Sequence, residues 1–409
     1  MKILLATRSV TPNSGVPSYN REVSAFLSRE HHIDLLVTED LKACTPYRKV
    51  YSTYGMSLDS FDGCQSLVQS INAESYDLII NSNSEFAAVL APFWNDNTKV
   101  ISVSHSLGTV DCINAVYNAD YTDHIIALSQ GCRSYISRHH SISSHGKISV
   151  VFNSIASHLN ADFIRDRKKT SEQISIVFAG GSAPSKSPDI IVQVLHKLCK
   201  TNRDFVFYWL GITTPPLKRL QPFRNIQDVL PNDSRIKVLG KIPQNEAAEI
   251  IANSNVFFAP SRREGFPMAL LEAMRIGCIP IVADYNIANR EIIIDGYNGF
   301  VISHNNIDGF VNKIIDIIDR PSTYDYIYDN CYHTFEDKLC FDVWYKQMSS
   351  VLANSDMTHS TRIPFTKYAF KRSLIGYSLS AKLSFFENFC KEIVPCAYKF
   401  RNFYRKYNK

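Results

Sequence analysis

Short apolar runs alternate with helix-like patterns along most of the chain. The runs are three to five residues long and rich in Val, Ile and Leu, which is typical of strands buried on both faces of a parallel sheet. In the first half they are Lys2–Ala6, Ile33–Val37, Leu78–Ile80, Val100–Val103, Ile125–Leu128 and Ile148–Val151. A second series begins at Ile174–Phe178, after a charged linker from Asp162 to Glu172. The pattern predicts two α/β halves, each built on a parallel sheet.

One stretch of the second half has the order strand, loop, helix, strand. Asn255–Ala259 is predicted to be a buried strand, Pro260–Gly265 a loop, and Ile279–Ala283 the next strand. Pro267 stands where a helix can begin without losing a hydrogen bond, and Gly277 can cap its end. The unpaired N–H groups at such a helix start suit an anion, above all a phosphate. We therefore expect a ligand with a diphosphate to bind here.

Two carboxylates, Glu264 and Glu272, flank this turn. Glu272 lies in Met268–Met274, which is otherwise apolar and should be packed between the sheet and its neighbours. A carboxylate taken out of water needs donors, and ligand hydroxyls can supply them. Alternatively, Glu272 reaches solvent or pairs with Arg275 three residues further on. The second carboxylate and the turn favour the ligand interpretation.

Glu264 to Glu272 resembles the Glu-x7-Glu motif of the retaining glycosyltransferases of family 4 (group 1), which have the GT-B fold. Two flanking motifs of that family are also present. Leu239–Pro243 matches "LG-x-(I/V)-P", and Glu291–Val301 matches "E-(I/L)-I-x-(D/N)-G-x-N-G-x-(L/V)". The resemblance covers most of the chain and is most specific in this region. It implies transfer of a sugar from a nucleotide-sugar donor.

The resemblance also implies a fold and a set of site residues. The fold is two Rossmann-like, doubly wound halves facing a central cleft, with a helical C-terminal tail. Glu264 would hold hydroxyls of the donor sugar and Glu272 those of the ribose, and neither is expected to be a covalent nucleophile. Retention would come from front-face attack assisted by the leaving phosphate. The donor-binding residues would be Gly15, Gly180, Lys186, Arg263, Gly265, Phe266, Pro267, Met268 and Glu272.

The first half carries fewer signals. Thr11–Ser18 follows the first strand, where open α/β sheets bind ligands, and the resemblance places a Gly-Gly pair here, of which only Gly15 is present. A lone glycine can equally be an ordinary turn residue. His105 ends an apolar strand, and the matching histidine of the family lies at the transferred sugar. A buried or surface structural histidine is the alternative.

The loop Gly180–Lys186 follows the first strand of the second half. Lys186 just precedes a helix and suits a diphosphate, although a lone lysine can also be a solvated surface charge. The family pattern here is "G-R-x…K-G", with both cations on the diphosphate. Gly181 stands in place of that arginine and Ser187 in place of the second glycine. Arg262 or Arg263 could take over the missing charge.

Leaving-group charge decides whether a metal is needed. When the bond between sugar and phosphate breaks, the departing nucleoside diphosphate gains charge, and preorganised cations or amides lower the barrier. Many transferases of another fold use a metal held by D-x-D, and this chain contains no D-x-D. Lys186 and the amides of Phe266 to Met268 are expected to replace it. No metal and no cofactor are therefore expected, and Glu264, His105 and Lys186 form the expected catalytic set.

Composition agrees with a two-domain enzyme. The chain has 409 residues, 45% of them apolar, which suffices for two cores. The ten cysteines are scattered without a C-x2-C pair, which favours reduced thiols and a cytoplasmic location. Met1–Lys2 leads straight into a strand, and no apolar run approaches the ~20 residues that span a bilayer. A soluble or peripheral protein is expected.

The last residues, 361–409, are unusually basic and aromatic. They hold eleven Lys and Arg residues against two acidic ones, and twelve aromatic residues. One predicted helical face is Leu379, Leu383, Phe386, Cys390 and Ile393, with Pro395 breaking the pattern. Such a segment suits an anionic membrane face, or it packs on the body with its basic side in solvent. Nucleic acid is not expected as a partner, because the rest of the chain is net acidic.

We therefore predict a metal-independent, retaining hexosyltransferase. The expected parts are an acceptor-side domain at 1–165, a donor domain at 166–338, a crossover helix at 339–360 returning to the first domain, and the tail. The resemblance and the tail suggest a glycan or lipid-linked acceptor in bacterial surface-polysaccharide synthesis, such as lipopolysaccharide, O-antigen, capsule or exopolysaccharide. The expected location is the inner face of the cytoplasmic membrane. Two alternatives are a nucleotide-sugar 2-epimerase and a degenerate sugar-nucleotide-binding or scaffold protein.

Overall fold

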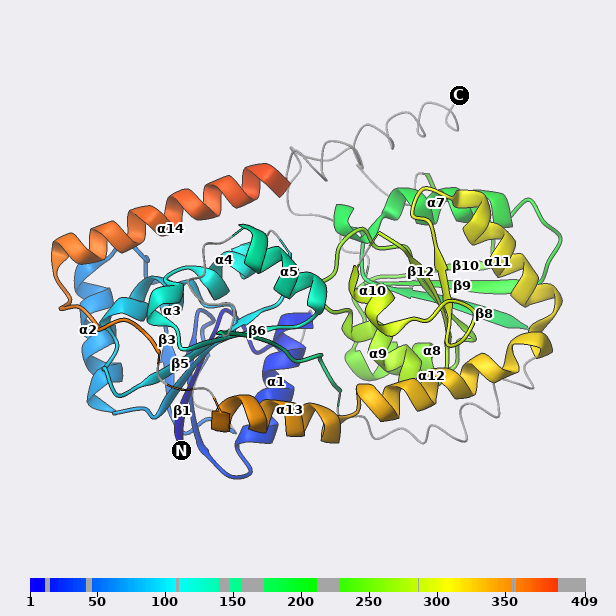
Figure 1. Cartoon of the computed structure of the whole chain (residues 1–409). Coiled ribbons are helices and arrows are strands. Elements are labelled where there is room, and N and C mark those ends of the chain that lie inside the picture. The colour runs from blue at the N-terminus through cyan, green and yellow to red at the C-terminus, as the bar shows by residue number, and fades with distance from the viewer. Residues whose placement is uncertain are drawn as a thin grey trace. The chain divides into compact units, whose positions relative to one another are not determined.

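The computed structural model contains two compact units (Figure 1). Unit 1 is Met1–Ser154 together with Trp344–Asn388, and the described part of unit 2 lies within Ile155–Val343. The structure describes the chain except for residues 12–14, 42–45, 108–109, 140–146, 156–172, 212–228, 286, 355, 357 and 389–409. The predicted domain boundary at 165 and the charged linker therefore lie outside the described residues.

Unit 1 contains a parallel sheet. Its described strands are β1 (Lys2–Thr7), β2 (His32–Val37), β3 (Val50–Ser52), β4 (Leu78–Asn81), β5 (Lys99–Ser104), β6 (His124–Ala127) and β7 (Ile148–Val150). Their order across the sheet is β3-β2-β1-β4-β5-β6-β7. The direction of winding changes at β1, which pairs with β2 on one side and with β4 on the other. Open α/β sheets bind ligands at the carboxyl ends of the strands beside such a switch point.

The helices of unit 1 come from both ends of its sequence. Those described are α1 (Gly15–Leu27), α2 (Phe61–Ala73), α3 (Glu85–Leu90), α4 (Val110–Val116), α5 (Gln130–His139), α13 (Phe341–Asn354) and α14 (Lys367–Asn388). Two short 3-10 helices, η1 (Ala91–Phe93) and η2 (Ala119–Tyr121), connect them. The first core cluster joins strand residues such as Leu4 and Ile79 to Phe370 of α14. The fold of this unit therefore includes the C-terminal helix.

Unit 2 contains the second parallel sheet. Its described strands are β8 (Ile174–Ala179), β9 (Phe205–Leu210), β10 (Ile236–Leu239), β11 (Val256–Ala259), β12 (Ile279–Ala283) and β13 (Phe300–Ile302). They are ordered β10-β9-β8-β11-β12-β13, so the switch point lies between β8 and β11. The described helices are η4 (Pro184–Lys186), α7 (Pro188–Leu198), α8 (Gln244–Ala252), α9 (Met268–Arg275), α10 (Ile287–Ile292), α11 (Ile307–Asp319), η6 (Pro321–Tyr324) and α12 (Asp325–Lys338).

The predicted elements are largely confirmed. The seven apolar runs all become strands, and β12 has the predicted bounds. The helix after the Gly-Phe-Pro turn begins at Met268, and Pro267 occupies the residue before it. Gly277 ends it with a φ of +73°, and the N–H of Cys278 reaches the carbonyl of Ala273 at 2.8 Å. The strands β3, β9, β10 and β13 were not predicted. In the edge strand β3, two partly exposed residues and one exposed residue carry almost no pattern.

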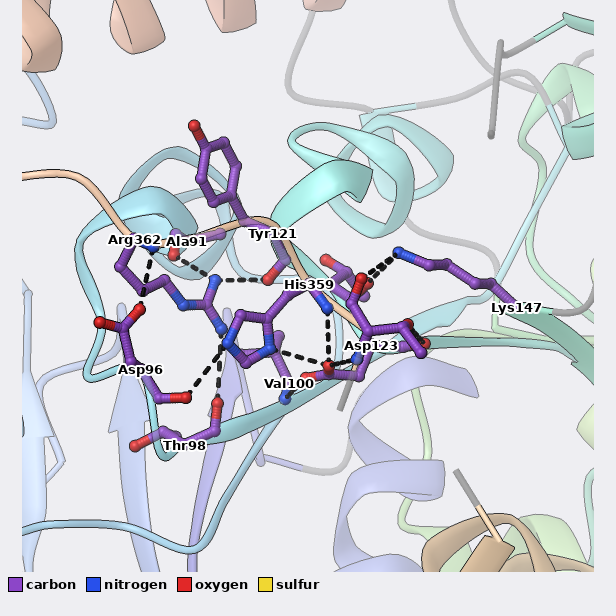
Figure 2. Close-up of polar contacts among 11 residues, drawn as sticks. Ala91, Asp96, Thr98, Val100, Tyr121, Asp123, Lys147, His359 and Arg362 are labelled. Atoms are coloured by element: carbon purple, nitrogen blue, oxygen red, sulfur yellow. Dashed lines mark hydrogen bonds and ion pairs between the residues drawn. The ribbon is translucent and has the colours of Figure 1, made fainter. Parts of the chain in front are cut away.

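The chain returns to unit 1 at Trp344, early in α13. There the ring of Phe26 from α1 meets the rings of Trp344 and Tyr345 edge-on, with centroids 5.2 and 4.6 Å away. The segment after α13 is then held by buried polar contacts (Figure 2). His359 Nδ1 lies 2.8 Å from Asp123 Oδ1, and Arg362 donates to the carbonyls of Ala91 (2.8 Å) and Tyr121 (2.5 Å). These contacts fix the start of the predicted tail on unit 1.

Two further sequence expectations bear on the described residues. Cys64, Cys112, Cys132, Cys199, Cys278, Cys331 and Cys340 are all free thiols. No helix in the described part of the chain is both long and apolar enough to cross a bilayer.

Candidate functional site

The two loops at the switch point of unit 2 bring Lys186 and Glu264 together. Lys186 ends the short helix after β8, and Glu264 lies in the loop after β11. The Lys186 Nζ donates to Glu264 Oε1, and both side chains remain partly exposed. Residues 78 positions apart in the sequence therefore form one charged pair where a ligand of this fold is expected.

A second ion pair holds these loops against each other. Arg262 donates from both terminal nitrogens to Asp189 at the start of α7, at 2.8 and 2.7 Å, and this pair is largely buried. The N–H of Arg262 also donates to the carbonyl of Ser185 at 2.8 Å. A bidentate, buried pair of this kind is directional and costly to break. Arg262 thus holds the loops that carry Lys186 and Glu264 against the start of α7.

The backbone explains why no arginine stands at position 181. Gly181 has a φ of +68°, and a Cβ there would lie 2.8 Å from the carbonyl oxygen of Gly211. Gly180 packs on the lysine stem, since its Cβ would meet Lys186 Cδ at 3.3 Å. The carbonyl of Gly181 accepts a hydrogen bond from Trp209 Nε1 at 3.2 Å. The loop is therefore built around glycine at both positions.

We expect that Gly181→Arg will not restore a family-like cation. An L-residue in the left-handed region costs roughly 1–2 kcal/mol, and the clash with a backbone oxygen adds to this. The variant should lower the denaturation midpoint of unit 2 and should not raise activity. Ser182→Arg is the matched control, because it adds the same charge one residue on without a positive φ. A Gly181→Arg protein as stable as that control would contradict this account.

Ser187 has the left-handed conformation that the family glycine would adopt easily. Its φ is +57°, and its hydroxyl lies 3.1 Å from Nε2 of the buried His304. The contact offsets part of the strain of a non-glycine residue at this position. The departure from the family pattern therefore keeps the turn that presents Lys186.

The loop before α9 and the helix itself carry the remaining predicted residues of unit 2. Gly265 and Phe266 are buried, and Arg263, Pro267, Met268 and Glu272 are partly buried. Glu272 shares the helix with the buried residues Leu270, Leu271, Ala273 and Met274. Burial lowers the pKa of Arg275, and electrostatic interactions with Glu336 and Tyr332 on α12 partly offset this effect.

In unit 1, His105 directly follows β5, two strands from β1 in the sheet, and is buried. A hydrogen-bond chain leads to it from the end of β1. Asn20 Nδ2 donates to Thr7 Oγ1 (2.6 Å), Ser82 Oγ donates to Asn20 Oδ1, and Ser82 Oγ lies 2.8 Å from His105 Nε2. Gly15 starts α1, the helix that carries Asn20, and is exposed.

This chain determines the tautomer of His105. The carbonyl oxygen of Ser9 can only accept, so the nitrogen of Asn20, 3.4 Å away, must face it, and Oδ1 must face Ser82. Ser82 then donates its only hydroxyl proton to Asn20 Oδ1. Its oxygen can therefore only accept from His105, so Nε2 of His105 carries the proton. Among the described residues no group bonds His105 Nδ1. Within the described part of the chain, Nδ1 of this imidazole can therefore accept a hydrogen bond from a ligand hydroxyl.

Burial also keeps this histidine neutral. The loss of solvation lowers the pKa of His105 from 6.5 to about 3. The unfolded chain takes up a proton below pH 6.5, whereas the folded protein does not, so His105 reduces stability as the pH falls from 6.5 towards 3. We expect the wild type to lose about 2 kcal/mol more than His105→Gln between pH 7 and pH 5, as measured by urea unfolding. If the free energies of unfolding of wild type and His105→Gln fell equally between pH 7 and pH 5, the imidazole would be solvated in the folded protein, which would contradict this account.

Three residues of this group were not predicted from the sequence. Asn20 and Ser82 position His105, and Tyr19 meets its ring edge-on with centroids 4.9 Å apart. The Tyr19 hydroxyl is buried and has no partner in the described part of the chain, which costs free energy unless water or a ligand pairs with it. The sequence could have indicated these residues, because Ser82 directly follows a strand and Tyr19 and Asn20 belong to the helix after β1.

A second polar group lies at the same edge of the sheet. Arg8, just after β1, donates from Nε to Glu85 Oε2 at 2.6 Å. Asp111 on α4 accepts hydrogen bonds from Asn83 and Ser106, and burial raises its pKa. Each of these residues follows the carboxyl end of β1, β4 or β5. Closely spaced carboxylates and a guanidinium are suited to the hydroxyls of a sugar.

Comparisons with known proteins find similarity in sequence over part of the chain. Residues 160–334 match the model of the glycosyl transferases group 1 family. An uncharacterized glycosyltransferase of Methanocaldococcus jannaschii is 31% identical over 144 residues, which is 35% of this chain and 38% of that protein. The UDP-Gal:alpha-D-GlcNAc-diphosphoundecaprenol alpha-1,3-galactosyltransferase of Escherichia coli is 29% identical over 184 residues, 42% of this chain and 46% of that protein. The chain thus spans less than half the length of these relatives.

The fold extends beyond that match. The structure of Anabaena HepE in complex with UDP-glucose superposes with a TM-score of 0.70, at 17% identity, over 86% of this chain and 99% of HepE. Together with the two parallel sheets, this similarity identifies the GT-B fold with a helical C-terminal region.

Proposed function

Because residues 160–334 match the group 1 glycosyl transferases and the chain has the GT-B fold, we propose that this protein is a retaining glycosyltransferase of family 4. It moves a hexose from a nucleotide-diphosphate sugar to a glycan or lipid-linked acceptor. The observation that carries the proposal is the contact between Lys186 and Glu264 at the switch point of unit 2. A UDP-sugar is the first donor to test, since HepE was solved with UDP-glucose and the E. coli relative is named for UDP-Gal.

The charged pair suits a donor that brings both a diphosphate and hydroxyls. Lys186 can exchange its carboxylate partner for a phosphate oxygen, which frees Glu264 to accept hydrogen bonds from the sugar. At the start of α9, the backbone N–H groups of Phe266 and Met268 are assigned to the same diphosphate, whereas Pro267 has no N–H to donate. Glu272, one turn further along α9, holds the ribose hydroxyls. No metal is assigned to this site.

The reaction breaks the bond between the anomeric carbon and the phosphate oxygen. The electron pair of that bond goes to the nucleoside diphosphate, where Lys186 and the helix-start amides stabilise the added charge. The acceptor oxygen bonds to the anomeric carbon on the same face, and its proton passes to the leaving phosphate. His105 accepts a hydrogen bond from the transferred sugar through Nδ1 and, being neutral, donates no proton from that atom.

The acceptor is assigned to unit 1, where the Arg8, Glu85 and Asp111 group offers partners for sugar hydroxyls. The E. coli relative acts on a diphosphoundecaprenol-linked sugar by its name, which supports a lipid-linked acceptor in cell-surface polysaccharide synthesis. Such an acceptor would place the protein on the inner face of the cytoplasmic membrane.

A donor screen tests the proposal. The purified protein is incubated with UDP-, GDP- and ADP-sugars, and the release of nucleoside diphosphate and the identity of the sugar are both followed. Slow hydrolysis of one donor, with its configuration retained in the released sugar, is the expected result. An epimerised sugar nucleotide would instead indicate the 2-epimerase. Binding without turnover, with every acceptor offered, would indicate a non-catalytic binding protein.

A further inference from the structure

Helix α14 has two apolar faces, and only one of them is used inside unit 1. The inner face carries the buried residues Phe370 and Tyr377, which pack against α3 and α4. The Tyr377 hydroxyl donates to Asn114 Oδ1 at 2.6 Å, and Ser373 Oγ donates to the carbonyl of Val89 at 2.8 Å. These contacts fix the rotation of the helix about its own axis. The opposite face is thereby held outwards.

The outer face carries large apolar side chains in solvent. Tyr368 is 77% exposed, Ile375 59%, Leu379 57% and Leu383 70%. Their spacing of seven, four and four residues places them on one stripe of the helix. Leu379 and Leu383 belong to the face predicted from the sequence, whereas Cys390, Ile393 and Pro395 lie outside the described residues. The predicted packing on the body is also present, but through different residues.

Basic side chains flank this stripe. Lys367, Lys371, Arg372 and Lys382 are all exposed, and the sequence from Lys367 to Leu383 contains no acidic residue. A second copy of the chain would meet this face with like charges, which disfavours a symmetric dimer. A partner that is both apolar and anionic fits it. The sequence beyond α14 adds six Lys and Arg residues and one Glu at 389–409.

We propose that the stripe Tyr368, Ile375, Leu379 and Leu383, with its flanking cations, docks the protein on an anionic bilayer surface. Helices of this kind lie in the interface plane, with apolar side chains inserted and cations at the head groups. The inner face of α14 stays in the core of unit 1 during this contact, so the helix need not detach. The inference extends beyond the proposed reaction, because vesicle binding is measured without donor or acceptor.

Point substitutions on the outer face give the sharpest test. Deleting the chain after Ser360 would also remove Phe370 and Tyr377 from the core and destabilise unit 1. The double variant Leu379→Asp, Leu383→Asp leaves those contacts intact. Ile287→Asp, Ile294→Asp on unit 2 is the matched control, because both isoleucines are 51% exposed.

We expect the full chain to float with vesicles of phosphatidylglycerol and phosphatidylcholine, and not with phosphatidylcholine alone. The outer-face double variant should bind the anionic vesicles roughly tenfold more weakly, and the control should bind like wild type. High salt should weaken binding, because salt ions screen the attraction between the basic side chains and the anionic head groups. A chain ending at Asn388 should still bind.

Three results would overturn the inference. The outer-face variant could bind like the control, or the chain ending at Asn388 could lose all binding, which would assign the contact to residues 389–409. Wild type could also be a dimer by light scattering that the outer-face variant converts to a monomer, without vesicle binding. A fall in vesicle binding that leaves donor turnover in solution unchanged would support the surface even if the proposed acceptor class were wrong.

Discussion

Lys186→Ala is expected to lower turnover by ~10²–10³ while the protein stays folded. In the proposed reaction the lysine stabilises charge that appears on the nucleoside diphosphate only as the sugar bond breaks, so its loss should reduce kcat more than it raises KM. The side chain is partly exposed, and its removal leaves the buried pair of Arg262 with Asp189 in place. Steady-state kinetics with the selected donor measure the effect.

The control is Lys197→Ala, which removes an exposed lysine paired with Asp308 at 2.6 Å on the same unit. It should leave kcat unchanged, because an exposed ion pair contributes little. Turnover should also persist in EDTA, since the leaving-group charge is assigned to Lys186 and the helix-start amides. Loss of activity with chelator, restored by magnesium, would show that the leaving group is stabilised by a metal instead.

Glu272→Ala is expected to weaken binding of the selected nucleoside diphosphate by ~1.5–3 kcal/mol, or about 10- to 150-fold. The carboxylate stands among buried residues of α9 and accepts charge-assisted hydrogen bonds from the ribose in the proposed complex. Isothermal titration of wild type and variant gives the difference directly. In contrast to Lys186→Ala, the defect should appear in affinity for the product and not mainly in kcat.

Glu249→Ala is the matched control, because Glu249 is an exposed glutamate on the neighbouring helix α8. The Glu249→Ala protein should bind the nucleoside diphosphate with the same affinity as wild type. Equal affinity in a folded Glu272→Ala protein would return Glu272 to a structural role on α9. A thermal melt of both variants separates loss of a ligand contact from loss of the fold.

Much of the architecture could be predicted because its causes are local. Runs such as Ile33–Val37 and Ile279–Ala283 are apolar, short and bounded by turn residues, and they became strands of two parallel sheets. The turn before α9 and the cap at Gly277 likewise follow from Pro267 and from the freedom of glycine. The strands β3, β9, β10 and β13 were missed, and α9 begins one residue after Pro267, because the ends of elements carry weak signals.

The role of single charges could not be predicted in the same way. Lys186 and Glu264 were both expected at the site, but only the folded loops show that they contact each other. Arg262 and Arg263 are equivalent candidates in the sequence. The structure engages Arg262 with a buried aspartate 73 residues away. Such assignments depend on which distant side chain is nearest, and no local pattern encodes that.

The sequence by itself determined the two α/β halves, the turn before α9 and the resemblance to family 4, because these depend on residues close together along the chain. Only the tertiary structure decided the tautomer of His105, which follows from hydrogen bonds reaching back to Asn20 and Ser82. It also decided which face of α14 is buried. A helix with apolar residues on two sides has no preferred face until neighbours such as α3 and α4 cover one of them.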